Sequence, residues 1–257
     1  MHQGNHGHFP NLLDLSIDVM GRLRGMLVHL VYLGPLRQYP ERHYLFGGAT
    51  PTGVGKSGNL TGDLLFGRPE LLKSTNIALA QFNIGYRLEI RRLVDREGTT
   101  SDVFALGLVN TLNGVETSLR DVGFGISQVL PVLVQSLLAE DNTVLIEQPE
   151  LHLHPRLQAE LGDVFITSAL GGRGNTFILE THSEHLILRI MRRMRDTERG
   201  TLPDGMPPVR PSDVSIIYVQ PTDEGSVPIP IDLDEDGQLL SAWPGGFFEE
   251  GFSERFS

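Results

Sequence analysis

Hydrophobic positions follow two alternating patterns in the second half of the chain. Short runs of continuous apolar residues lie at 143–146, 176–179 and 214–219. Between them, apolar residues recur every three or four positions at 127–139, 155–170 and 183–195. The first pattern predicts buried strands and the second predicts helices, the last two with Pro155 in the first turn and Ser183 as N-cap. Apolar strands that alternate with helices are typical of a parallel sheet covered on both faces, so we expect an α/β fold.

The first half of the chain is less regular. Helical spacing from 11 to 29 runs into a short strand that ends at Leu33, and a Pro- and Gly-rich stretch at 38–58 predicts a loop. The segments expected to follow are helices at 59–66 and 70–82 and strands at 84–94 and 103–109. At the C-terminal end, residues 227–233 and 238–243 are expected to pair as a small β-hairpin annex.

Composition restricts the class of protein. The 257 residues, 40% hydrophobic and 21% charged, are typical of one large soluble domain with a small annex. No apolar run approaches the length of a membrane span, and residues 1–10 lack the layout of a signal peptide, so we expect a cytoplasmic protein without a membrane partner. The sequence contains no cysteine, which excludes disulfides and thiolate metal sites.

Charge argues against nucleic acid as the main partner. The formal net charge is −11, and residues 223–257 carry nine acidic residues and one arginine. DNA contact therefore remains possible only through a local basic stripe, since the average surface is acidic. The candidate stripe consists of Arg189, Arg192, Arg193, Arg195 and Arg199. Because acidic residues interrupt it, we favour a solvated helix face over a DNA-binding surface.

The strongest chemical signal is the segment Thr143-Val-Leu-Ile-Glu-Gln-Pro-Glu150. Its apolar run places Glu147 at the carboxyl tip of a buried parallel strand, where α/β folds bind their ligands. In nucleotide hydrolases this position holds Mg²⁺, and the next acidic residue polarises the attacking water. Upstream, a Gly-rich turn at 121–128 opens a helix whose free N–H groups suit a phosphate. Downstream, His182 follows the next predicted strand.

These three pieces, in this order, resemble the ABC-type ATPases, in the AAA-like branch related to the SMC and overcoming-lysogenization-defect proteins. The resemblance extends to the segments YLGPLR at 32–37, EQPELHLHP at 147–155, ETHSEH at 180–185 and WPGGFFE at 243–249. It implies a P-loop NTPase-like parallel sheet with flanking helices, the ABC-type C-terminal half. It also implies a small C-terminal domain of unknown function, which corresponds to the β annex. The expected domains are an N-terminal helix and tail at 1–30, the ATPase domain at 31–220 and an acidic annex at 221–257.

The resemblance also implies the ligands and the roles of residues. ATP and Mg²⁺ would be the cofactors, Glu147 would take the Mg²⁺ position and His182 would sense the γ-phosphate. Gly125, Ser127 and Gln128 would meet the nucleotide bound by the opposite subunit, so ATP would join two copies in a head-to-tail homodimer. A protein effector is a further expected partner.

Two features depart from the family pattern. The only segment like a Walker A loop is Thr50-Pro-Thr-Gly-Val-Gly-Lys-Ser57, which lacks the first glycine and follows no strand. We therefore favour the interpretation that the chain is the C-terminal part of a longer ATPase over a working P-loop at Lys56. The second departure is Gln148, which stands where the usual base is a carboxylate and cannot accept a proton. Glu150 supplies the base, or turnover is slow, or nucleotide is bound without hydrolysis.

Other chemistry is less well supported. Asp232 to Gly237 copies the start of an EF-hand loop, but Trp243 occupies the position of the last ligand. His152, His154, His182 and His185 could suggest zinc, but His152 and His154 lie in a predicted loop without an acidic or thiol partner at zinc-ligand spacing. Three hypotheses therefore remain: an ATPase, a nucleotide-responsive regulatory module without hydrolysis, and a fragment that cannot hold ATP.

Overall fold

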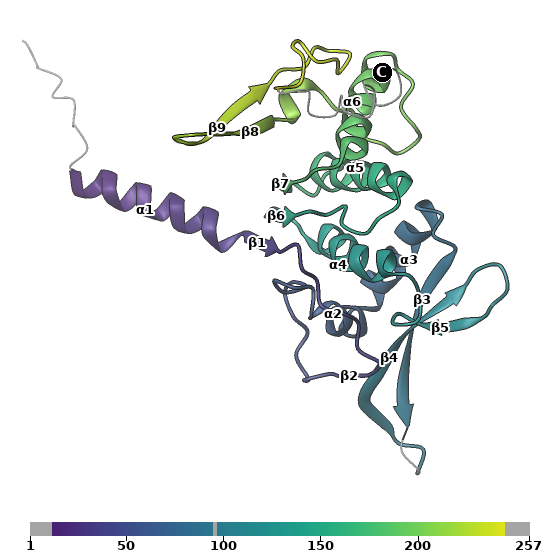
Figure 1. The fold of residues 1–257 in the computed structure, drawn as a ribbon. Helices are drawn as coiled ribbons and strands as arrows, with labels where there is room; N and C mark the ends of the chain where they lie inside the picture. Colours follow the sequence, from purple (N-terminus) through teal and green to yellow (C-terminus); the bar gives the residue numbers. More distant parts are fainter. Residues whose placement is uncertain (1–11, 95–96, 245–257) are drawn as a thin grey trace, which may run out of the picture.

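The computed structural model describes residues 12–94 and 97–244. Figure 1 shows two larger sheets with helices packed between and beside them, a separate β-hairpin, and one helix that projects from the body. The first sheet is parallel and contains β1 (Leu30–Leu33), β6 (Thr143–Glu147) and β7 (Thr176–Glu180), in the order β1-β6-β7. Its register pairs Glu147 with Glu180 and Leu33 with Ile146. The parallel sheet expected for the second half is thus confirmed for β6 and β7, and their carboxyl ends lie side by side.

The third apolar run of the second half lies elsewhere. β8 (Ile216–Thr222) pairs antiparallel with β9 (Gly225–Ile231) in a separate two-stranded sheet. The prediction that 214–219 joins the parallel sheet is therefore wrong. The expected β annex is confirmed, but its hairpin has other bounds. Residues 227–233 and 238–243 meet only at the antiparallel bridge between Leu233 and Leu239 and its flanking hydrogen bonds, and the main hairpin is formed by β8 and β9. The reason is local: a two-residue turn joins β8 to β9, and so short a connection favours antiparallel pairing of neighbours.

The second sheet is antiparallel and lies on the other side of the helices. It orders β2 (Tyr44–Leu45), β4 (Thr100–Asn110) and β3 (Tyr86–Val94), and β5 (Glu116–Ser118) pairs with β4 as well. The two long strands match the expected ones within a few residues. β2 and β5 were not predicted, because two or three residues are too few to show an alternating pattern.

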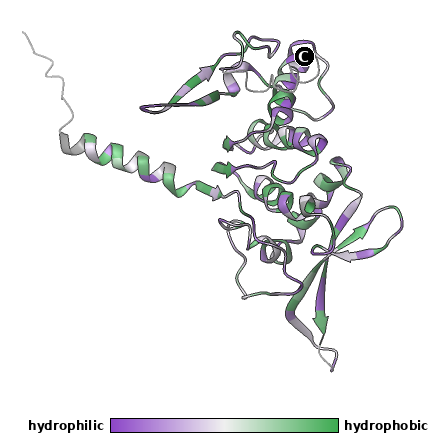
Figure 2. Cartoon of the chain, in the orientation of Figure 1, coloured by the Kyte–Doolittle hydropathy of each residue, from purple (hydrophilic) through white to green (hydrophobic). Residues whose placement is uncertain are grey.

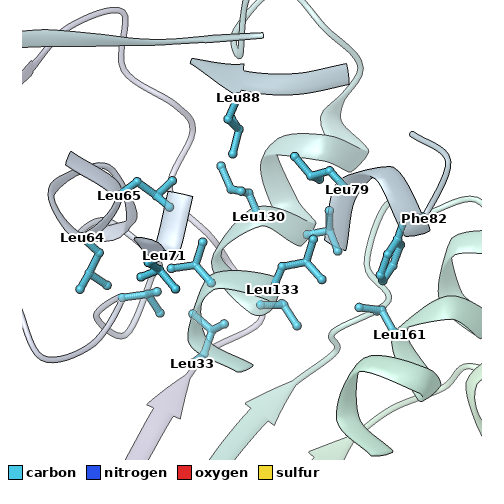
Figure 3. Packing of buried hydrophobic residues seen from close by; sticks show 14 of the residues in the cluster. Leu33, Leu64, Leu65, Leu71, Leu79, Phe82, Leu88, Leu130, Leu133 and Leu161 are labelled. Carbon is cyan, nitrogen blue, oxygen red and sulfur yellow. The ribbon is translucent and has the colours of Figure 1, made fainter. Parts of the chain in front are cut away.

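Five helices pack with these sheets: α2 (Thr61–Gly67), α3 (Pro69–Gln81), α4 (Phe124–Leu138), α5 (Pro155–Leu170) and α6 (Glu184–Glu198). α4 is central and is buried on every side from Ser127 to Ser136. Figure 3 shows its Leu130 and Leu133 between Leu88 of β3 and Leu33 of β1. Because α4 contacts both sheets, its N-terminus is fixed relative to the parallel strands.

The helix that projects from the body is α1 (Leu12–Val28) (Figure 1). It coincides with the helix predicted at 11–29, but many of its apolar side chains are exposed. Those that are largely exposed are Leu15, Ile17, Val19, Met20, Leu23, Leu27 and Val28. Figure 2 shows hydrophobic segments along this projecting helix. Among the described helices, none is both long and apolar enough to cross a membrane.

Arginines of α6 do not form a solvated stripe. Arg193 is 7% exposed, and its guanidinium forms a bidentate contact with Asp163 of α5. Arg189 also contacts Asp163. The expectation of a solvated face is therefore wrong for these two residues, because α5 supplies a largely buried carboxylate opposite them. It holds for Arg192, whose side chain is 61% exposed.

Candidate functional site

The carboxyl ends of the three parallel strands form the candidate site. Glu147 ends β6, the middle strand, and its Oε1 accepts a hydrogen bond of 2.7 Å from the Tyr32 hydroxyl of β1. This bond, together with partial burial and the nearby carboxylate of Glu180, raises the pKa of Tyr32. Glu180 lies opposite Glu147 in the register. Two carboxylates therefore share one edge of the sheet, and a neutral phenol orients one of them.

A tight turn follows Glu147. Gln148 has φ of +45°, in the left-handed region that residues with a side chain seldom adopt. Its N–H donates to the Glu180 carbonyl over 2.7 Å, which joins the turn to β7. Its carbonyl, like that of Glu147, accepts hydrogen bonds from the Arg37 guanidinium. Neighbouring strands therefore hold the turn on both sides, which stabilises a strained backbone at this position.

Glu150 lies inside the protein rather than at the surface. The residue is 8% exposed, and its Oε1 accepts a 2.7 Å hydrogen bond from the backbone N–H of His182. Its Oε2 is buried without a hydrogen-bond partner among the described residues. One oxygen thus connects the β6 loop to the tip of β7, and neither oxygen faces solvent in this conformation.

His182 is presented to solvent at the end of β7. Its side chain is 65% exposed, and its Nε2 lies 3.5 Å from Glu180 Oε1. The next residue, Ser183, caps α6 by accepting a hydrogen bond from the Leu186 N–H, as expected from the sequence. The imidazole therefore stands between a strand and a helix, free to meet a ligand above the sheet.

The Gly-rich turn at 121–128 is exposed at Asp121 and Gly123. Gly123 is the exposed N-cap of α4, and Gly125 is half-buried. A Cβ at Gly125 would lie 3.1 Å from the His152 carbonyl oxygen, so a larger residue would crowd this contact. Both glycines line an open cavity of about 850 Å³. Ser127 and Gln128 are 6% and 4% exposed and face the interior.

The segment around Lys56 does not have the structure of a phosphate-binding loop. It follows the antiparallel strand β2 rather than a strand of the parallel sheet. The Val54 N–H donates to the Gln135 side chain, and the Leu60 N–H donates to the Val54 carbonyl. One of the N–H groups that would have to cradle a phosphate, that of Val54, is thus bound to a protein side chain. The exposed Lys56 ammonium lies 5.4 Å from the centre of the Tyr32 ring, near Glu147.

The residues at the strand tips fit one metal and not another. Mg²⁺ needs only one or two carboxylates when phosphate oxygens and waters supply the other ligands. Glu147 meets this need, since Tyr32 holds one of its oxygens and the other accepts no hydrogen bond from residues 12–94 and 97–244. Across the same residues, no group of three or more histidine or acidic side chains has the arrangement of a metal site. The geometry thus offers a magnesium ligand but no zinc cluster.

Sequence reasoning missed three residues of this site: Tyr32, Arg37 and Glu180. Tyr32 and Arg37 stand at the ends of the segment YLGPLR, and Glu180 opens ETHSEH. Both segments contributed to the family resemblance, so the resemblance already marked these stretches of sequence as candidates for the site. Tyr32 and Arg37 contact Glu147 across 115 and 110 positions of sequence, and Glu180 contacts Gln148 from the next strand. No local pattern reports contacts over such distances.

Comparison with protein families gives two matches. Residues 58–189, a little more than half of the chain, match the family described as "AAA domain, putative AbiEii toxin, Type IV TA system". Residues 209–254 match a family described as "Protein of unknown function (DUF3696)". A search of curated proteins finds no significant match.

Solved structures similar to this chain include SMC heads. One, from "Structural biochemistry of ATP-driven dimerization and DNA stimulated activation of SMC ATPases", is 11% identical with a TM-score of 0.44; the match covers 67% of this chain and 89% of that chain. The Smc head with a coiled coil and joint from Pyrococcus yayanosii is 12% identical with a TM-score of 0.44, covering 69% and 30%. An SmcHead bound to the C-winged helix domain of ScpA is 11% identical with a TM-score of 0.45, covering 71% and 48%.

The chain thus spans less than half of the length of two of these heads. TM-scores below 0.5 describe a loose likeness, so the assignment rests on the family match. That match begins after the Lys56 segment and contains the Gly-rich turn, the Glu147 strand tip and His182. It is followed by the match over the annex that the sequence led us to expect. The chain belongs to the AAA-domain ATPase family and carries the C-terminal domain of unknown function in addition.

Proposed function

We propose that this chain forms the Mg²⁺-binding and γ-phosphate-sensing part of an ATP-binding and ATP-hydrolysing site. In this proposal ATP joins two copies head to tail, and the dimer transmits the nucleotide state to a protein effector. The observation that carries the proposal is the convergence of Glu147, Tyr32 and His182 at one edge of a parallel sheet. Ligands of α/β folds bind beyond this edge.

Each residue takes a role that its surroundings allow. Glu147 holds Mg²⁺ with the carboxylate oxygen that Tyr32 leaves available. Mg²⁺ supplies charge stabilisation to the transferred phosphate. His182, exposed above β7, donates to the terminal phosphate, and Gln148 orients the attacking water through its side-chain amide. These roles need few protein groups, because phosphoryl transfer depends chiefly on positioning and electrostatics.

The dimer follows from the position of the Gly-rich turn. Gly123 and Gly125 lie on an open cavity lined by residues other than Glu147 and His182. The N-terminus of α4 therefore suits a phosphate presented by another copy, which it would stabilise with free N–H groups and the helix dipole. Two such contacts make a closed twofold assembly. Ser127 and Gln128 would support this turn from inside rather than touch the nucleotide.

A second candidate function is nucleotide-responsive regulation without hydrolysis. Glu150 favours it, because the carboxylate that could replace the missing base is buried and already bonded to the His182 N–H. A base must reach the proton that it accepts, directly or through one water. If Glu150 keeps this conformation with nucleotide bound, ATP would be held and sensed but hydrolysed slowly or not at all.

Phosphate release from Mg·ATP distinguishes the two candidates, measured with the protein in the form that its gene encodes. Hydrolysis by wild type that falls about 10²-fold or more in Glu147→Gln and in His182→Ala would support the ATPase. His185→Ala is the matched control, since His185 is an exposed histidine three positions away in α6. Binding of ATP without phosphate release would favour the regulatory module. Equal hydrolysis by all four proteins would refute the assignment of the site.

A further inference from the structure

Arg37 is the most unusual charged residue near the site. It is 6% exposed and lies on the loop after β1. Its NH1 donates to the Gln148 carbonyl over 3.1 Å, and its NH2 donates to the Glu147 and Gln148 carbonyls over 2.9 and 3.1 Å. An arginine buried for structural reasons usually faces a carboxylate, whereas this one binds two successive backbone oxygens. Its planar fork therefore fixes the course of the chain between the two proposed functional side chains.

The turn that Arg37 holds is strained. The φ of Gln148, +45°, disfavours any residue with a Cβ, and such a conformation persists only where surrounding contacts enforce it. Here the guanidinium fixes the carbonyl side of the turn, and the Glu180 carbonyl fixes the N–H of Gln148. Without Arg37, the backbone at Gln148 would relax toward a common conformation and turn the Glu147 carboxylate away from the strand tips.

Glu150 carries the opposite charge and acts on the other side of the turn. Its Oε1 binds the His182 N–H, and its charge stabilises the protonated Arg37, although burial lowers the pKa of Arg37 to about 10. Arg37 Nε and Glu150 Oε2 are both buried without a hydrogen-bond partner in the described residues. Proteins rarely leave such atoms unsatisfied, and a buried charge is tolerated when its partner charge is near.

We propose that Arg37 and Glu150 are a positioning pair that holds the tips of β1, β6 and β7 in one arrangement, Arg37 through the Glu147–Gln148 turn and Glu150 through His182. The inference rests on the proposed function, since it gives the pair the task of spacing Glu147 from His182. It assigns Glu150 to positioning rather than to proton transfer. The two residues touch no nucleotide; they set the distance between the residues that do.

Amide hydrogen exchange of residues 1–257, measured by NMR without nucleotide, tests the pair. In Arg37→Lys the charge remains but the fork is lost, so the amides of Gln148 and His182 should exchange about tenfold faster or more. The amides of Val144 and Leu145, inside β6, should change less than about twofold. Arg173→Lys is the matched control, because Arg173 also donates to a backbone carbonyl, that of Leu137, outside the proposed site.

Glu150→Gln keeps the size and an acceptor oxygen but removes the charge. It should speed exchange of the Gln148 amide, which Glu150 does not contact. In the double variant, the acceleration of Gln148 exchange should be smaller than the product of the accelerations in the two single variants. Unchanged Gln148 exchange in both single variants would overturn the proposal, and so would equal acceleration throughout β6. If Arg37→Lys fails to fold, the Gln148 amide in Glu150→Gln decides alone.

Kinetics separate this inference from the proposed function. In the form of the protein that its gene encodes, Arg37→Lys should lower kcat for ATP with little change in KM, because positioning acts after binding. If amide exchange in the variants responds as expected but the wild type hydrolyses no ATP, the positioning pair is supported and the ATPase is refuted. If the wild type hydrolyses ATP but exchange in the variants is unaltered, the ATPase is supported and the positioning pair is refuted.

Discussion

Replacing Asp163 by alanine tests how α6, and with it His182, is held on the protein. Asp163 lies on α5 and is the main partner of two arginines of α6. Its Oδ1 accepts from Arg193 Nε and its Oδ2 from Arg193 NH2, each over 2.8 Å, and Oδ2 also accepts from Arg189 NH1. The side chains of Asp163 and Arg193 are 16% and 8% exposed. These contacts, chiefly the one with Asp163, raise the pKa of Arg193. The guanidinium stays charged when Asp163 is removed, because an arginine is protonated at neutral pH even without a partner.

The magnitude follows from what remains after the substitution. Removing one member of a buried ion pair typically costs about 3–5 kcal/mol, because the other charge is left uncompensated. Arg193 would keep one hydrogen bond of 2.9 Å to Asp196, and Arg189 would keep Glu160 at 3.6 Å. We therefore expect the lower end of the range, about 3 kcal/mol of unfolding free energy. Arg192→Ala removes a largely exposed ion pair of 3.7 Å and should cost less than about 1 kcal/mol.

The assay is urea unfolding of residues 1–257 followed by circular dichroism. The unfolding midpoints of wild type, Asp163→Ala and Arg192→Ala are compared, with one shared slope of unfolding free energy against urea concentration. A midpoint for Asp163→Ala close to that of Arg192→Ala would refute the reasoning. It would mean that solvent reaches the α5–α6 contact and screens it. A large shift for Asp163→Ala alone would support a buried anchor that fixes α6 directly after His182.

Three further outcomes follow from the structure. Residues 1–257 should bind Mg·ATP with an affinity weaker than micromolar by calorimetry, because the Lys56 segment lacks the first glycine of a P-loop and follows no strand of the parallel sheet; micromolar binding that Lys56→Ala abolishes would show that Lys56 works as a P-loop lysine. In the form that the gene encodes, Gly123→Arg should prevent ATP-induced dimers seen by light scattering, since Gly123 is exposed and has open space for a side chain; dimers independent of ATP would contradict the head-to-tail arrangement. Leu133→Ala should lower the unfolding free energy by about 2–5 kcal/mol, since Leu133 is fully buried at the centre of α4; a loss below about 1 kcal/mol would argue that the core is loosely packed.

The sequence by itself determined the elements whose pattern is local. Residues 155–170 show helical spacing with a proline in the first turn, and the structure has a helix with those bounds. Ser183 caps the next helix as expected. Glu147 stands at a strand tip because the three apolar residues before it lie in a strand, and a strand brings its last residue to the edge of the sheet. These features depend on residues a few positions apart, which is the range that periodicity and capping report.

Only the tertiary structure decided which segments meet. β8 has the same apolar pattern as β6 and β7, yet a short turn gives it β9 as partner. Glu150 has the sequence position of a base but is buried, because the loop after β6 turns inward and the His182 N–H binds its carboxylate. Arg37 has no local signal of its role, since its partners are 110 and 111 positions away. The pattern of a single sequence does not show such long-range hydrogen bonds or the loss of solvent around these groups, because both arise only when the strands pack side by side.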